Sequence, residues 1–167
     1  HLAEANALLS QDGRYQPQIY DTANGWRTLC ERKDIDLVYV CTDWLTHTLM
    51  ACYAMEQNKH VAIEVPAATT VAECWQLVDT SERTRRHCFM LENCCYGEHE
   101  LMVLNMVRQG LFGELVYCEG GYRHDLREEV CHGVEKRHYR LRNYKVRNCD
   151  NYPTHALGPI AKALDIN

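Results

Sequence analysis

Three strand-sized apolar runs, separated by two helical patterns, constrain the fold of this chain more than any other feature. The runs cover residues 36–42, 60–66 and 88–91. Short connections between strands and helices that alternate in this way predict right-handed crossovers and a parallel sheet. A continuous apolar run such as 36–42 is typical of a strand that is buried on both faces. We therefore predict an α/β fold with an incomplete doubly wound, Rossmann-type parallel sheet.

Cap and stop signals place the remaining elements. The helix after the first strand runs to 58–59, and Thr69 or Thr70 caps the next helix. The apolar residues of that second helix recur at helical spacing, at Val71, Trp75 and Val78. The other predicted elements are a helix at 2–9 that stops at 11–13, an edge strand at 18–20, a helix at 21–32 capped by Asp21 or Thr22, a helix at 98–109, an antiparallel strand at 113–122, a polar loop at 123–151 and a helix opened by 152–155.

The predicted elements change character near residue 93. Residues 1–93 are expected to form the C-terminal part of a dinucleotide-binding domain, and residues 94–167 the beginning of an α+β substrate domain. The second part supplies at most two strands, which is fewer than a stable sheet needs. The first helical pattern has no start signal, and the chain ends just after another helix. We therefore expect an internal fragment of a longer protein.

Composition and charge argue against several classes of protein. With 46% hydrophobic and 25% charged residues, the chain is typical of a soluble globular protein, and no apolar run is long enough to span a bilayer. The net charge of −5 gives no electrostatic reason to expect a nucleic-acid partner. Whether the chain forms a homo-oligomer stays open.

The ten cysteines do not indicate a disulfide framework or a metal centre. No pair has C-x-x-C spacing, and Cys41, Cys52 and Cys74 stand where small core residues would stand. We expect reduced, buried thiols, with the adjacent cysteines at 94–95 as packing residues. A zinc site built from the histidines and the cysteine within 124–138 would match no known spacing, so no metal is expected.

Polar residues follow each of the three predicted strands, at 42–47, 64–66 and 92–93. The carboxyl ends of parallel strands share one edge, where ligands of open α/β sheets bind. We therefore expect the three clusters to line one crevice. His47 either hydrogen-bonds the backbone at the start of its helix or has a functional role. Glu64 either caps its strand or accepts hydrogen bonds from ribose hydroxyls or borders a nicotinamide.

Spaced motifs run through nearly the whole chain. They are the segment 34–42, Trp44 with His47, the segment 59–61, the run Glu64-Val65-Pro66-Ala67-Ala68, and the segments 91–96, 122–125 and 152–155. Together these motifs resemble those of glycoside hydrolase family 109. The enzymes of that family are NAD-dependent α-N-acetylgalactosaminidases within the glucose-fructose oxidoreductase and inositol dehydrogenase superfamily. The resemblance implies NAD as the cofactor and a small molecule or glycan with terminal N-acetylgalactosamine as the substrate.

The same resemblance assigns site residues. It implies that NAD is contacted by Trp44, Leu45, Thr46, His47, Glu64, Val65 and Asn93. It implies that the sugar is contacted by Tyr122, Arg140, Tyr152, Pro153, Thr154 and His155, with Arg140 as an anchor for a hydroxyl or the acetamido group. For proton transfer we expect Tyr122, His124 and His155, with Glu92 as a supporting carboxylate. Which of them removes the C2 proton stays open.

The implied reaction uses NAD without consuming it. NAD⁺ takes a hydride from C3 of the sugar, and the resulting ketone acidifies the C2 hydrogen. A base removes that hydrogen while the C1 substituent leaves, water adds to C1, and the hydride returns. This route is a recognised exception to the two-carboxylate scheme of most glycosidases.

Two features depart from the superfamily pattern. The chain has no G-x-G-x-x-G phosphate loop. Val65 stands where dehydrogenases of the superfamily usually carry the lysine that transfers the proton, and valine cannot do so. This weakens the alternative of a sugar or inositol dehydrogenase. A non-catalytic sugar- or cofactor-binding relative, or an inert fragment, is the other alternative.

Overall fold

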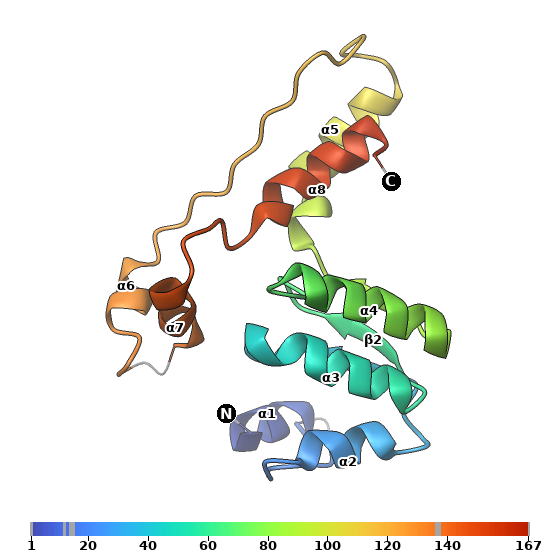
Figure 1. Cartoon of the computed structure of the whole chain (residues 1–167), viewed down its shortest axis with the longest axis vertical. Coiled ribbons are helices and arrows are strands. Elements are labelled where there is room, and N and C mark those ends of the chain that lie inside the picture. The colour runs from blue at the N-terminus through green and yellow to red at the C-terminus, as the bar shows by residue number, and fades with distance from the viewer. Residues whose placement is uncertain (1, 12, 14–15, 136–137, 167) are drawn as a thin grey trace.

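The computed structural model describes residues 2–11, 13, 16–135 and 138–166. The elements are, in order, α1 (Leu2–Leu9), α2 (Gly25–Glu31), β1 (Leu37–Val40), α3 (Trp44–Glu56), β2 (His60–Ile63), α4 (Val71–Thr84), β3 (Cys88–Met90), the short 3₁₀ helix η1 (Asn93–Cys95), α5 (Glu98–Arg108), α6 (Arg127–Cys131), α7 (Tyr139–Val146) and α8 (Pro153–Leu164). Figure 1 shows α2, α3 and α4 stacked as one layer, with α5 and α8 projecting from it as a pair.

The sheet consists of three parallel strands in the order β1-β2-β3. Val38 is registered with Val61, which is registered with Cys88, so these side chains share one face of the sheet. That face packs against α3 and α4. The core is formed by buried residues of this face and of α2, α3 and α4, namely Cys30, Val40, Ala51, Cys52, Ala54, Met55, Val61, Ile63 and Leu77. The predicted incomplete parallel sheet of an α/β fold is confirmed.

The opposite face of the sheet has no cover among the described residues. Leu37, Tyr39 and Phe89 are 52%, 53% and 44% exposed. Tyr39 and Phe89 both align with Ala62, so they lie in one row across this face. The prediction that strand 36–42 is buried on both faces is therefore wrong for this chain, because the described helices pack on one face only.

Side-chain caps define the starts of α3 and α4. The carboxylate of Asp43 accepts a hydrogen bond of 3.0 Å from the N–H of Leu45. Thr70 and Glu73 form a reciprocal capping box at the start of α4, which confirms the prediction of a threonine cap. The apolar residues predicted on α4 do not face the core, because the helix packs through Leu77 and Thr80 instead. Their exposed fractions are 73% for Val71, 63% for Trp75 and 46% for Val78.

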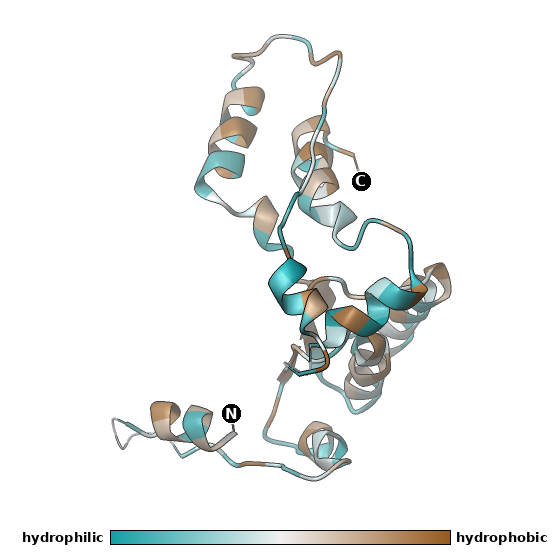
Figure 2. Ribbon diagram, turned by 90° about the vertical axis from the view of Figure 1, so that its left-hand side faces the viewer, coloured by the Kyte–Doolittle hydropathy of each residue, from teal (hydrophilic) through white to brown (hydrophobic). Residues whose placement is uncertain are grey.

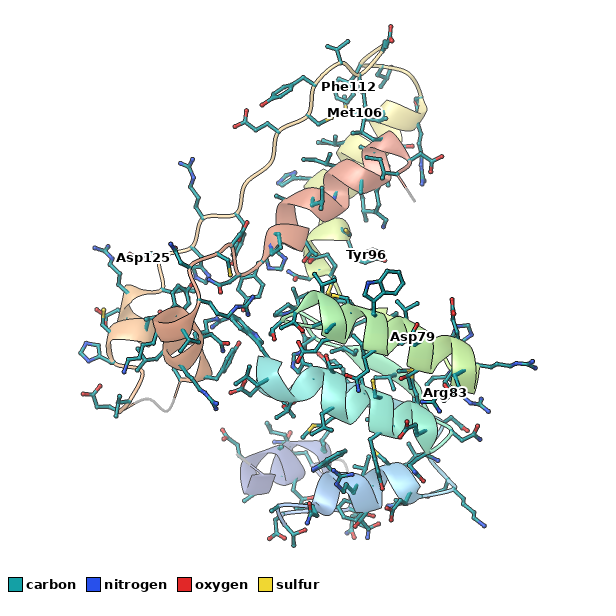
Figure 3. All side chains as sticks on the ribbon, viewed as in Figure 1. Asp79, Arg83, Tyr96, Met106, Phe112 and Asp125 are labelled. Carbon is teal, nitrogen blue, oxygen red and sulfur yellow. The ribbon has the colours of Figure 1, made fainter. Side chains whose placement is uncertain are left out.

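The second part of the chain is a helical pair that returns to the end of β3. α5 and α8 pack against each other, and α8 also packs against η1. The Cβ of any larger residue at Gly158 would lie 2.7 Å from the sulfur of Cys95, so glycine permits this close approach. Figure 3 shows Tyr96 at the end of the pair nearest the sheet and Phe112 at the far end. The domain boundary predicted between residues 93 and 94 stays a prediction.

Two elements predicted near the N-terminus differ from the structure. The segment 18–20 is not a strand. The hydroxyl of Tyr20 accepts a 3.1 Å hydrogen bond from Arg32, which ties this segment to the end of α2. The helix predicted at 21–32 starts only at Gly25, after Asn24, so neither Asp21 nor Thr22 caps it.

The segments before and after residue 123 also differ from prediction. Residues 113–122 form no strand, and Figure 1 shows them within a long drawn-out segment that leads from α5 to α6. Val116 is 90% exposed, because the described part of the chain offers this segment no strand to pair with. The predicted loop at 123–151 contains two short helices, α6 and α7. Figure 2 shows that the ribbon of this region is coloured largely as hydrophilic residues, which is why no apolar periodicity revealed the helices.

All ten cysteines are free, as predicted, but they are not all buried. Cys52 is buried in the core, whereas Cys41 and Cys74 are exposed, which contradicts their predicted core positions. Cys41 follows the last residue of β1, and Cys74 lies on α4 beside the larger of the two main cavities. Across the described ranges, the helices are too short or too polar for a transmembrane span.

Candidate active site

A cavity of about 400 Å³ lies at the carboxyl ends of β1 and β2. This volume is within the range of about 300–1,000 Å³ that is typical of ligand pockets. All three polar clusters that follow the strands contribute to its lining, as the parallel topology predicts. The residues that were assigned from the sequence and line the cavity are Trp44, His47, Glu64, Val65, Asn93, Tyr122, His124, Arg140, Tyr152 and His155.

His47 connects two of the strand ends through its imidazole ring. The ring is 1% exposed, with Nδ1 2.8 Å from the carbonyl oxygen of Pro66 and Nε2 3.0 Å from that of Thr42. Carbonyl oxygens only accept hydrogen bonds, so a neutral ring donates to one of them at a time. His47 therefore hydrogen-bonds the backbone, which is one of the two alternatives predicted for it. Its contact with NAD stays a prediction.

Glu64 is held at the end of β2 by the neighbouring strand. The hydroxyl of Tyr39, on β1, donates a hydrogen bond to its carboxylate. This bond is the main reason that the pKa of Tyr39 is raised to about 12, and loss of solvent around the ring is a smaller cause. The phenol therefore stays protonated at neutral pH and remains a donor to Glu64. The bond fixes the position of the Glu64 side chain at the edge of the cavity.

Aromatic rings form the wall opposite the strand ends. The ring centroids of Tyr139 and Tyr152 lie 5.2 and 5.4 Å from that of Trp44, in edge-to-face contacts. Arg140 donates to the hydroxyl of Tyr152 through Nη2 at 2.7 Å and Nε at 3.2 Å. Burial, reinforced by the neighbouring Tyr152, raises the pKa of Tyr139 to about 12. A fixed guanidinium is therefore supported on a neutral aromatic wall.

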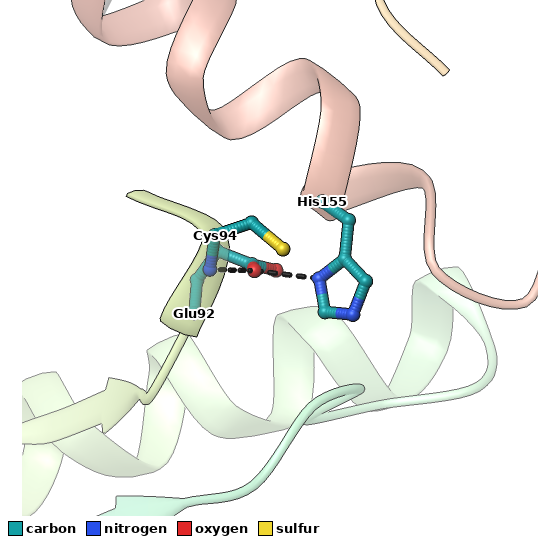
Figure 4. A group of neighbouring side chains, drawn as sticks. All are labelled: Glu92, Cys94 and His155. Atoms are coloured by element: carbon teal, nitrogen blue, oxygen red, sulfur yellow. Dashed lines mark hydrogen bonds and ion pairs between the residues drawn. The ribbon is translucent and has the colours of Figure 1, made fainter. Parts of the chain in front are cut away.

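His155 and Glu92 form a buried pair, although 63 residues separate them in the chain. Nδ1 of His155 lies 2.6 Å from Oε1 of Glu92, and the side chains are only 9% and 8% exposed (Figure 4). The same carboxylate oxygen accepts a 3.0 Å hydrogen bond from the N–H of Cys94. His155 also stacks on Tyr152, with the ring centroids 4.8 Å apart. The bond to Glu92 fixes the ring and leaves Nε2 to face other groups.

Tyr122 and His124 form a second hydrogen-bonded pair beside the first. The hydroxyl of Tyr122 lies 3.0 Å from Nδ1 of His124, and its ring centroid lies 4.6 Å from that of His155. The four residues expected to handle protons thus form one contiguous group from Glu92 to His124. Histidine and tyrosine in such pairs can donate and accept protons near neutral pH. The arrangement can therefore support acid–base chemistry at two adjacent positions.

Comparisons with known proteins decide the family. A model described as oxidoreductase family, NAD-binding Rossmann fold, matches residues 3–92, and a model of the glycosyl hydrolase 109 C-terminal domain matches residues 96–167. A protein of Bacteroides fragilis named alpha-N-acetylgalactosaminidase is 52% identical over the whole chain. The chain belongs to this NAD-binding oxidoreductase family, and its second part matches the C-terminal domain of glycosyl hydrolase family 109. The resemblance stated from the motifs is confirmed.

The family 109 relatives are longer than this chain. Glycosyl hydrolase family 109 protein 2 of Phocaeicola vulgatus is 49% identical over the whole chain. The chain spans 40% of the Bacteroides fragilis relative and 41% of the Phocaeicola vulgatus one. Among solved structures, an NAD-binding protein from Listeria innocua is similar, with a TM-score of 0.55 and 26% sequence identity. The match covers 67% of this chain and 30% of the Listeria innocua chain.

Several residues assigned from the resemblance lie outside this cavity. Leu45 and Thr46 are on α3 but do not line the cavity, and the hydroxyl of Thr46 bonds the carbonyl of Asp43 at 2.7 Å. Pro153 and Thr154 line a larger cavity of about 670 Å³ beside α4. Glu92 is buried and reaches the cavity only through His155. Their roles toward NAD and the sugar stay predictions.

Two residues that line the cavity were not assigned from the sequence. Tyr139 lies on α7, within the segment that was predicted as a loop, and Cys41 was assigned to the core. The neighbouring Arg140 was the available signal for Tyr139, because adjacent residues at the start of a helix can both reach one pocket. For Cys41 the signal was its place directly after a parallel strand, where ligands bind.

Proposed function

We propose that the protein containing this chain removes terminal α-linked N-acetylgalactosamine from a glycan or small glycoside. The observation that carries the proposal is 52% identity, over the whole chain, to a protein named alpha-N-acetylgalactosaminidase. The reaction is oxidation at C3, elimination across C1 and C2, addition of water at C1 and re-reduction at C3. Val65, in the place of the proton-transferring lysine of dehydrogenases, supports hydrolysis over net oxidation.

The polar groups at the strand ends fit the nicotinamide half of a dinucleotide. The carboxylate of Glu64 can accept from ribose hydroxyls, and Asn93 offers both an amide donor and an acceptor. Trp44 and His47 provide buried walls beside them. When bound there, NAD⁺ supplies a hydride acceptor for C3 of the sugar. The other half of the cofactor needs a phosphate-binding loop, which these residues do not provide.

The two hydrogen-bonded pairs supply the proton transfers. The reaction needs a base for the C3 hydroxyl, a base for the C2 hydrogen and an acid for the departing oxygen. The Tyr122–His124 pair and the Glu92–His155 pair lie side by side and face one cavity. We assign the proton transfers at these positions to the two pairs together, and we assign Arg140 to hold a hydroxyl or the acetamido oxygen.

The test uses a recombinant protein that contains this chain and has the length of its relatives. With a nitrophenyl α-N-acetylgalactosaminide and NAD⁺, we expect release of nitrophenol without net NADH. In D₂O, the released sugar should carry deuterium at C2, because the C2 hydrogen is exchanged during elimination and re-addition. A direct displacement would leave C2 unlabelled, and accumulation of NADH with free sugar would support a dehydrogenase. Either result would overturn the proposal.

Replacement of His155 tests the assigned residues. His155→Ala should lower kcat by about 10²–10⁴-fold, the usual contribution of a general acid or base. His99, an exposed histidine on α5, provides the matched control, and His99→Ala should leave the rate unchanged. A His155→Ala protein that is folded and as active as His99→Ala would show that the Glu92–His155 pair has no catalytic role.

A further inference from the structure

Two side chains of the proposed acid–base group, Glu92 and His155, lie close to Cys94, which the proposed reaction does not use. Glu92, Cys94 and His155 each offer one ligand atom, and these atoms all lie within 4.8 Å of one another. Figure 4 shows the carboxylate of Glu92 between the backbone nitrogen of Cys94 and the imidazole ring, with the sulfur of Cys94 beside it. Two of the residues are adjacent to or within η1, and the third lies in the first turn of α8, so the cluster joins two elements that are distant in the sequence.

The donor atoms are of the kinds that zinc prefers. A thiolate, an imidazole nitrogen and a carboxylate oxygen bind Zn²⁺ at about 2.0–2.3 Å, which places tetrahedral ligand atoms roughly 3–4 Å apart. The carboxylate oxygen and Nδ1 would move apart from their present 2.6 Å, and the sulfur, which lies within 4.8 Å of both, would approach them by no more than roughly 1–2 Å. These shifts are within the reach of side-chain rotation. A thiolate ligand disfavours Mg²⁺ and Ca²⁺, which select oxygen donors.

A separate observation indicates that the cluster has an unused acceptor. The side chain of Glu92 is only 8% exposed. Its Oε2 atom is buried and has no hydrogen-bond partner within the described residues. An unpartnered buried carboxylate oxygen is unfavourable, and a cation would satisfy it. With Glu92 ionised and Cys94 as a thiolate, the two negative charges of the cluster would match a divalent cation, which suits a site with little solvent.

We propose that Glu92, Cys94 and His155 form a binding site for a divalent cation of the zinc class. The ligands are a carboxylate oxygen, Sγ and Nδ1, with a fourth position left for water. On binding, the thiol proton of Cys94 is released to solvent, and the imidazole carries its proton on Nε2. The cation breaks the hydrogen bond between His155 and Glu92. If the proposed glycosidase function holds, occupation of the site inhibits the enzyme.

The test measures binding directly and does not depend on glycosidase activity. The 167-residue chain is titrated with Cd²⁺, which reports thiolate coordination through a charge-transfer band in the ultraviolet. We expect the first equivalent to produce the band, and Zn²⁺ but not Mg²⁺ to abolish it. Cys94→Ser should remove the band, and Glu92→Gln should weaken binding by more than about tenfold, since even outer-shell substitutions have effects of that size.

Cys131→Ser provides the matched control, because Cys131 is a free, exposed cysteine on α6, outside the cluster. The control should bind Cd²⁺ as the parent chain does. An unchanged band in Cys94→Ser, or equal affinity in Glu92→Gln and the parent chain, would overturn the proposal. The two variants change different ligands, so misfolding of one, detected by circular dichroism, leaves the other decisive. Activity without metal binding would refute the site alone, and metal binding without activity would refute the glycosidase alone.

Discussion

The hydrogen bond between Glu92 and His155 joins two parts of the chain that are distant in the sequence. The contribution of this bond to the free energy of unfolding can be measured. The two atoms are 2.6 Å apart, and both side chains are more than 90% buried. A hydrogen bond to a charged group with this little solvent contributes about 1.5–3 kcal/mol. In a double-mutant cycle, Glu92→Gln, His155→Gln and the double variant should therefore show a coupling free energy of about 1.5–3 kcal/mol.

The assay is equilibrium unfolding in urea, followed by tryptophan fluorescence, since the ring of Trp44 lies beside that of Tyr152 on the cavity wall. Asp125 and Arg127 supply a control cycle, because they form an ion pair of 2.7 Å with side chains that are 62% and 84% exposed. Exposed pairs of this kind often contribute nothing measurable, so we expect no resolved coupling there. Equal coupling in the two cycles would show that burial does not strengthen the Glu92–His155 bond.

Two further outcomes follow from the helices. Partial burial alone would raise the pKa of Glu73, but hydrogen bonds from Thr69 and Thr70 outweigh it and lower the pKa below its ordinary value of 4.5. These hydrogen bonds therefore stabilise the fold above pH 4.5, and the stabilisation is lost as the pH falls through the lowered pKa. In urea unfolding measured at several pH values, Glu73→Gln should not show this loss of stability at low pH. Gly158→Ala should destabilise the chain by about 1–3 kcal/mol through overpacking, because the new Cβ would lie 2.7 Å from a buried sulfur. Gly121→Ala, with no atom within 4 Å of its Cβ, should leave the urea midpoint unchanged, and an equal shift in both variants would contradict the packing argument.

The parallel sheet could be predicted because its signal is local. Each strand is an apolar run short enough to exclude a helix, and the connections between the runs are long enough only for one helix each. The direction of the strands then follows from the handedness of such crossovers. The same signal predicted more burial than the structure shows, because Tyr39 belongs to the apolar run but is 53% exposed.

The second part was harder to predict because its order depends on contacts between distant segments. The alternation at 113–122 favours a strand, but a strand forms only where another pairs with it, and none is present in the described part of the chain. Half of the eight residues of α7 are arginine, asparagine or lysine, and its apolar residues do not gather on one side, so its apolar periodicity is too weak to reveal a helix. Its position is set by aromatic packing of Tyr139 on Trp44, which no local pattern encodes.

The candidate site shows the same division between local and distant information. Topology alone places Glu64 and Asn93 at one edge, because both follow strands of the same sheet. The contact between Glu92 and His155 could not be derived in this way, because it requires α8 to return to η1 at close range. Gly158 is the residue that permits this return. The acid–base group therefore depends on packing between the two parts of the chain, so a substitution that separates α8 from η1 should impair the site while leaving the sheet intact.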